Sequence, residues 1–98
     1  MTDAAADIRL KKLRFRAWHR GFREADLILG PFADRHLAGL DAAELDAFEA
    51  LIDQPDPDLY AWIIGKAEAP ATFAGPMLEQ IRAFRLSLPI ARGDLSGG

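Results

Sequence analysis

The fold is decided by residues 41–65, which read DAAELDAFEALIDQPDPDLYAWIIG. Asp41, followed three residues later by Glu44, forms an acidic variant of the capping box, in which each side chain accepts a hydrogen bond from the other residue's backbone N–H. The apolar residues that follow recur at helical spacing and make one buried face: Leu45, Phe48, Leu51 and Ile52. This half of the stretch therefore predicts an amphipathic helix with Asp41 as its N-cap.

The other half predicts a second helix after a short turn. Asp56 is expected as its N-cap, Pro57 suits the first helical position, and Asp58 complements the helix dipole. Gly65 is placed to end the helix, because glycine readily adopts the left-handed conformation found there. Its inner face is expected to hold Leu59, Trp62 and Ile63.

Further helices are predicted on both sides of this pair. The first covers about 7–18, with Ile8, Leu13, Phe15 and Trp18 as apolar candidates. The second covers about 20–37, with Leu27, Ile28, Phe32 and Phe22 as candidates and a bend or split at Gly30-Pro31, because proline clashes with the preceding turn. The last begins near Pro76, and its inner face carries Met77, Ile81, Phe84 and Leu88.

The chain is therefore expected to be all-α, a compact bundle of about five short helices. It contains no valine and no alternating strand pattern, and 98 residues suit one domain over 1–98, with a disordered Gly/Ser-rich tail over about 92–98. The predicted core includes Leu45, Phe48, Leu59, Trp62, Ile63, Ile81 and Phe84.

The composition excludes several classes of protein. The chain has no cysteine, which rules out disulfides, thiolate metal sites and thiol catalysis. No apolar run approaches the roughly 20 residues of a membrane-spanning helix, and the cations of residues 8–15 are unlike a secretory signal. We therefore expect no membrane insertion, and the lack of disulfides is compatible with a reducing cytoplasm.

Charge is divided unevenly along the chain. Residues 1–36 hold eight Lys/Arg and five Asp/Glu, whereas residues 37–98 hold four and ten. One interpretation is two solvated faces that attract each other weakly. The other is a basic patch that steers an acidic partner. A pI near 5.2 argues against nucleic acid as that partner.

Motifs for catalysis, metal or cofactor binding are absent. The sequence contains no HExxH, no phosphate-binding loop and no GxGxxG, so we expect no catalytic residue, no metal site and no cofactor-binding residue. A zinc site built from His19, His36 and scattered carboxylates stays open as a weak alternative.

Residues 18–24, WHRGFRE, are less easily explained by helix formation alone. Arg20 and Glu24 stand four apart with the cation first, which is the less favourable order for a helical ion pair. Gly21 between them lowers helix propensity. Either Gly21 relaxes a junction between two helices, with Glu24 favouring the dipole, or the segment is a small polar docking spot that a partner approaches closely.

Two motifs in this sequence resemble a known family. Arg20-Gly21-x-x-Glu24, followed by Asp26-Leu27 and Phe32, resembles the RGxxE signature of the succinate dehydrogenase assembly factor 2 family, whose bacterial members are called SdhE. A second signature follows in Phe48-Glu49-x-Leu51 and Asp56-Pro57-Asp58-Leu59-Tyr60-x-Trp62-Ile63, with Gly65. The resemblance covers roughly residues 13–65, and the order and spacing of both motifs match the family.

The resemblance implies a five-helix bundle that is not an enzyme. Members bind the flavoprotein subunit of succinate dehydrogenase, and in some bacteria of fumarate reductase, and promote covalent attachment of FAD to a histidine of that partner. It implies that Arg20, Gly21 and Glu24, with the neighbouring His19, bind the partner, and that FAD is not stably bound by this chain. We expect the first three to form an exposed patch whose loss abolishes function but spares the fold.

Two other functions remain to be weighed. One is a regulatory or antitoxin-like protein that binds a cytoskeletal or nucleic-acid target through its basic N-terminal face. The other is a small stand-alone enzyme, against which the missing motifs argue.

Overall fold

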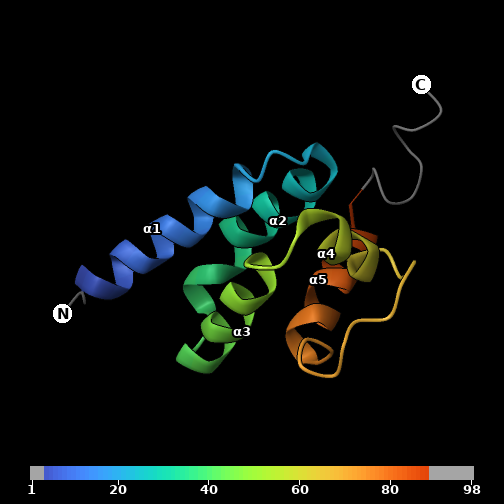
Figure 1. The fold of residues 1–98 in the computed structure, drawn as a ribbon. Helices are drawn as coiled ribbons and strands as arrows, with labels where there is room; N and C mark the ends of the chain where they lie inside the picture. Colours follow the sequence, from blue (N-terminus) through green and yellow to red (C-terminus); the bar gives the residue numbers. More distant parts are fainter. Residues whose placement is uncertain (1–3, 89–98) are drawn as a thin grey trace.

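The computed structural model describes residues 4–88, and in that range it confirms an all-helical fold with no strand (Figure 1). The helices are α1 (Ala4–Trp18), α2 (Arg23–His36), α3 (Ala42–Ile52), α4 (Asp56–Ile63) and α5 (Pro76–Leu86), and a 3-10 turn, η1 (Leu37–Gly39), follows α2. Helix α1 is the longest and lies along α2, whereas α5 contacts α2, α3 and α4. The tail expected over 92–98 lies outside the described residues.

The core is built on α2, α3 and α5, which meet through three aromatic rings. Phe32 of α2 stacks on Phe48 of α3 with ring centroids 5.7 Å apart, and meets Phe84 of α5 edge to face at 5.6 Å. Both geometries are favourable for aromatic pairs. The predicted core is confirmed for Phe48, Leu59, Trp62, Ile63, Ile81 and Phe84, which are all buried. Leu45 is only partly buried and packs against the edge of this cluster.

The start of α3 is the capping box that the sequence predicts. The backbone N–H of Glu44 donates to Asp41 Oδ1 at 2.8 Å, and the backbone N–H of Asp41 donates to Glu44 Oε1 at 3.0 Å. Two otherwise unpaired N–H groups are satisfied in this way.

The start of α4 differs from the prediction. Pro55 holds the N-cap position without a side-chain hydrogen bond, and Asp56 is the first helical residue. The prediction that Asp56 caps α4 is therefore wrong. Its carboxylate is used elsewhere, as described below. The other end is confirmed, because Gly65, at φ +78°, follows the last turn of α4.

Pro31 does not split α2. The helix continues from Arg23 to His36 with the proline inside it, so of the predicted bend or split, the split is wrong. The reason is tertiary packing. Residues on both sides of the proline are buried in the core, and this burial offsets the hydrogen bond that the proline removes. They are Ile28, Leu29, Phe32 and Ala33.

The face that α1 buries is narrower than expected. Of its predicted core residues only Leu13 is buried, whereas Ile8 is 53% exposed, Phe15 63% and Trp18 36%. Ala17, which is fully buried, shares the inner side with Leu13. The prediction followed the largest apolar side chains, but α1 packs mainly against α2, with smaller contacts to α3 and η1, so a stripe of modest width suffices. Leu27 of α2, also predicted to be buried, is likewise 36% exposed.

The C-terminal end of α1 is fixed to α2 by Trp18. Its indole ring lies against Gly30, where any Cβ would collide with the ring. Its Nε1–H donates to Asp34 Oδ2 at 3.1 Å, one turn further along α2. Glycine at position 30 thus allows the close approach that sets where α1 ends and where the next loop begins.

Candidate docking site at the junction of α1 and α2

The candidate site is the loop of residues 19–22 together with the first turn of α2. Gly21 lies at the tip of the loop with φ +86°, a left-handed conformation that costs other residues about 1–2 kcal/mol. The residue is exposed, and no heavy atom lies within 4 Å of where a Cβ would stand. The backbone therefore requires glycine here even though the space beside it is open. This turn also explains why α2 begins at Arg23 and not near Arg20 as predicted.

Arg20 is not part of an exposed patch, and this corrects the sequence-based expectation. Its side chain is only 8% exposed. Its Nε–H donates to Asp56 Oδ1 at 2.5 Å, and its terminal nitrogens donate to the carbonyl oxygens of Ile52 and, at 2.8 Å, Gln54. One guanidinium thus donates hydrogen bonds to acceptors at the end of α3 and at the start of α4 at once. The planar, forked guanidinium of arginine allows this.

Arg20 also holds its own loop to α2. Its backbone N–H donates to Asp26 Oδ1 at 3.0 Å, a contact that crosses over Gly21. The ion pair of Arg20 with Glu24 that the sequence allowed does not form, because Asp56 takes the guanidinium. The two signature motifs are therefore joined in space, which sequence reasoning missed. The only available signal was that both motifs occur together.

Glu24 and His19 are exposed side chains of the site, as is Arg23 at the start of α2. Glu24 lies in the first turn of α2, where its carboxylate interacts favourably with the positive end of the helix dipole. It has no ion pair within residues 4–88. The His19 ring stacks on Phe15 with centroids 4.1 Å apart, and its Nδ1 lies 2.7 Å from the Phe15 carbonyl oxygen. The structure thus places Gly21, Glu24 and His19 at the surface and Arg20 beneath them.

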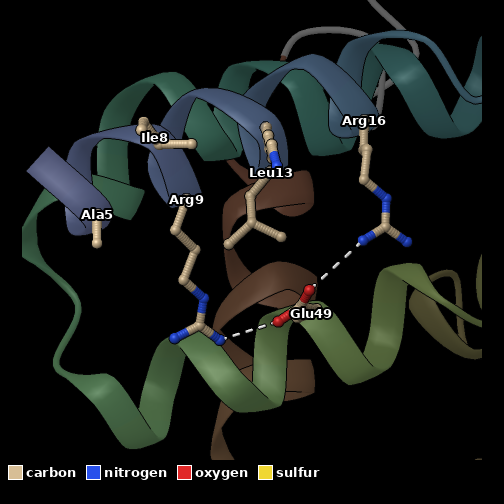
Figure 2. Close-up of a pocket in the computed structure, with 7 residues that line it drawn as sticks. Ala5, Ile8, Arg9, Leu13, Arg16 and Glu49 are labelled. Carbon is tan, nitrogen blue, oxygen red and sulfur yellow. Dashed lines mark hydrogen bonds and ion pairs between the residues drawn. The ribbon is translucent and has the colours of Figure 1, made fainter.

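Ion pairs between α1 and α3 account for part of the uneven charge. Arg9 contacts Asp46 at 2.7 Å and Glu49 at 3.0 Å, and Arg16 contacts Glu49 at 3.7 Å and also Asp53. Hydrogen bonds to Asp46 and then Glu49 raise the pKa of Arg9 above its ordinary value. Figure 2 shows both arginines reaching from α1 to Glu49, across a cleft of about 390 Å³. Such solvent-exposed pairs contribute little to stability, because water and salt screen them.

The rest of the described chain offers little for other chemistry. Residues 4–88 contain no cluster of three or more potential metal ligands. His36 packs against Phe32 and Phe84 at ring distances of 4.9 and 5.6 Å, whereas His19 stacks on Phe15 of α1. No helix in the described part is long and apolar enough to cross a membrane.

Comparison with known families identifies the family of the chain that carries this loop. The model of the family described as flavinator of succinate dehydrogenase, Sdh5, matches residues 11–85, which include every residue of the candidate site. The chain belongs to this family. The resemblance seen in residues 13–65 is thereby confirmed, and the match extends it to residue 85, within α5.

Similar proteins occur in both bacteria and eukaryotes. The chain is 39% identical over 72 residues to the mitochondrial succinate dehydrogenase assembly factor 2 of Dictyostelium discoideum. The aligned segment covers 74% of this chain and 51% of that relative. It is 37% identical over 73 residues to the FAD assembly factor SdhE of Acetobacter pasteurianus, covering 74% and 67%. It is 35% identical over 71 residues to the Vibrio cholerae protein of that name, covering 72% and 83%. The chain thus spans about half the length of the Dictyostelium relative.

Proposed function

We propose that this protein binds the flavoprotein subunit of succinate dehydrogenase and promotes the covalent attachment of FAD to it. The observation that carries the proposal is the family match over residues 11–85, which includes the whole junction of α1 and α2. The names of the relatives, FAD assembly factor and succinate dehydrogenase assembly factor, support the same role. The flavoprotein of fumarate reductase, whose chemistry is related, is a second candidate partner.

The geometry supports docking through the loop. Gly21 presents bare backbone at the tip, so a partner's surface can approach it without meeting a side chain. Glu24 and His19 lie exposed beside it and offer a carboxylate and an imidazole for hydrogen bonding. Arg20 acts underneath, by fixing the loop to the ends of α3 and α4.

FAD in this proposal is a substrate of the partner, which holds both the flavin and the residue that receives it. Within residues 4–88 this chain has no strand, and so no strand–turn–helix cradle for a dinucleotide pyrophosphate. Its contribution is to hold the immature flavoprotein in an arrangement in which the partner's own groups react. Fixing groups in a near-attack geometry is by itself a large source of rate enhancement.

The alternative of a regulatory protein that binds nucleic acid gains no support from the described surface. Arg9, Arg16 and Arg20 of the basic segment are engaged by Asp46, Glu49, Asp53 and Asp56 within the molecule. Fewer cationic side chains are then available to neutralise the phosphates of a nucleic-acid backbone. The cytoplasmic location stays a proposal. It is supported by two bacterial relatives, while the Dictyostelium relative is named mitochondrial.

Reconstitution tests the proposal. Purified apo-flavoprotein is incubated with FAD, with and without this protein, and covalent flavin is read as in-gel fluorescence after denaturation. We expect fluorescence of the flavoprotein band to rise severalfold with the protein present, and the protein itself to carry no flavin after gel filtration. Equal fluorescence in both samples, without complex formation, would overturn the proposed function. A yellow preparation with stoichiometric FAD would overturn the proposed division of roles.

A further inference from the structure

A ridge of exposed side chains runs along α1 to the candidate loop. We define the α1 ridge as Ile8, Lys11, Lys12, Phe15 and His19. From Ile8 to Lys11 or Lys12, then to Phe15 and on to His19 just beyond the end of α1, each step is three or four residues, so these side chains follow one side of the helix. That side is opposite the one on which Leu13 and Ala17 are buried against α2. Figure 2 shows Arg9 and Arg16 reaching toward α3, with Ile8 at the border of the cleft that these arginines cross.

The ridge contains the two most exposed large apolar side chains of α1. Ile8 is 53% and Phe15 63% exposed, so neither contributes much to folding. Scattered exposed apolar residues are ordinary, but here they are aligned. The ring of Phe15 also stacks on the ring of His19, with an interplanar angle of 19°. This stacked pair lies next to the loop that carries Gly21. A preformed aromatic surface of this kind is typical of the anchoring centre of an interface.

The charge of the ridge is positive although the protein as a whole carries −3. Arg9 and Arg16, on the flank toward α3, are neutralised by the carboxylates there. Lys11 and Lys12 are exposed and make no ion pair with any residue from 4 to 88. The ridge is therefore complementary to a partner surface that carries carboxylates.

The ridge is continuous with the candidate site. A hollow of about 230 Å³ lies between the two and is lined by Phe15, Arg16, His19, Arg20 and Asp56. His19 belongs to both the ridge and the junction loop. A partner that covers Gly21 and Glu24 would therefore reach the ridge without a gap.

We propose that the α1 ridge is a second part of the docking surface for the flavoprotein subunit. Phe15 and Ile8 enter an apolar recess of that subunit, and carboxylates at the rim of the recess face Lys11 and Lys12. This inference rests on the proposed function and extends it, because it names a surface outside the signature motif and the chemistry of what covers it.

The apolar part is tested by comparing Phe15→Ala with Leu86→Ala. Leu86, on α5, is 60% exposed and lies off the ridge, so it is a matched control. Affinity for purified flavoprotein is measured by calorimetry, and folding by thermal melting. We expect Phe15→Ala to weaken binding about ten-fold or more, the effect of losing an anchoring aromatic side chain. Leu86→Ala should change it less than about two-fold, with both proteins melting like wild type.

The charged part is tested with Lys11→Glu and Lys12→Glu, made singly, against Lys66→Glu in the exposed loop after α4. The ridge variants should associate more slowly than the control at low salt, and the difference should shrink as salt rises. The loss caused by Phe15→Ala should instead persist at high salt.

The outcomes separate this inference from the proposed function. If wild type binds flavoprotein but Phe15→Ala binds equally well, the inference is overturned and the proposed function stands. If wild type does not bind flavoprotein, both are overturned. If wild type is a dimer that Phe15→Ala converts to a monomer, the ridge contacts a second copy of this chain and the inference is again overturned.

Discussion

The guanidinium of Arg20 donates from Nε to the Oδ1 atom of Asp56 at 2.5 Å, across 36 positions of the chain. This bond joins the loop between α1 and α2 to the start of α4. Because the same guanidinium also serves the carbonyls of Ile52 and Gln54, the loop that carries Gly21 has a fixed position relative to α3. The arginine of the signature is thus a structural support for its exposed neighbours.

Replacing Arg20 is therefore expected to weaken the fold as well as the binding. Arg20→Ala should lower the free energy of unfolding by about 2–4 kcal/mol, because it leaves three partly buried acceptors without this donor. Arg20→Lys should recover less than half of this loss, since an ammonium group cannot reach three separated acceptors. Urea denaturation measures both. Arg23→Ala, at an exposed residue without an ion pair in the described range, is the control and should change stability by less than about 0.5 kcal/mol.

Substitutions of Gly21 separate backbone strain from docking. Gly21→Ala and Gly65→Ala should each cost about 1–2 kcal/mol, because both glycines have positive φ and open space beside them. Gly21→Arg should melt like Gly21→Ala, yet bind flavoprotein far more weakly, since only the long side chain blocks close approach. If the two Gly21 variants bind equally well, no partner backbone approaches this glycine.

Glu24 is expected to act in binding and hardly in folding. Glu24→Gln removes a charge from the first turn of α2, which should cost less than about 1 kcal/mol of stability. Binding to the flavoprotein should fall about ten-fold, the loss typical of a charged hydrogen bond at an interface. Glu68→Gln, in the exposed loop before α5, is the matched control. Unchanged affinity of the Glu24 variant, measured by calorimetry, would remove Glu24 from the site.

The aromatic centre of the core should be far more sensitive than the ridge. Phe48→Ala is expected to cost about 3–5 kcal/mol, because Phe48 is fully buried and stacks on Phe32. Phe15→Ala should cost less than about 0.5 kcal/mol, since that ring is mostly exposed. Thermal melting followed by circular dichroism compares them. Equal melting temperatures would contradict the burial of Phe48 in the core.

Features that depend on neighbours along the chain were predicted well from the sequence. The capping box of Asp41 and Glu44, the stop at Gly65 and the buried face around Phe48 all arise within one or two helical turns. Local spacing and backbone preference decide such features, so a short stretch of sequence is sufficient evidence for them.

Features that depend on distant residues were not predicted. Asp56 has the residue type of an N-cap and stands at the right place, but a cation 36 residues earlier takes its carboxylate. Phe15 has helical spacing to Trp18 and the size of a core residue, but within residues 4–88 it stays 63% exposed and stacks only on the ring of His19. Which side of a helix is covered depends on the arrangement of the other helices, which single-helix periodicity does not contain.

The narrow buried stripe of α1 has a consequence for the timing of local opening. Among the described side chains, α1 buries only Leu13 and Ala17, whereas the shorter α5 buries Met77, Leu78, Ile81 and Phe84. A helix with less buried apolar surface opens at a smaller free-energy cost than the whole domain. Amide hydrogens of α1 should therefore exchange with solvent sooner than those of α5. A partner that covers α1 would slow that exchange most, so docking and the ordering of this helix are energetically coupled.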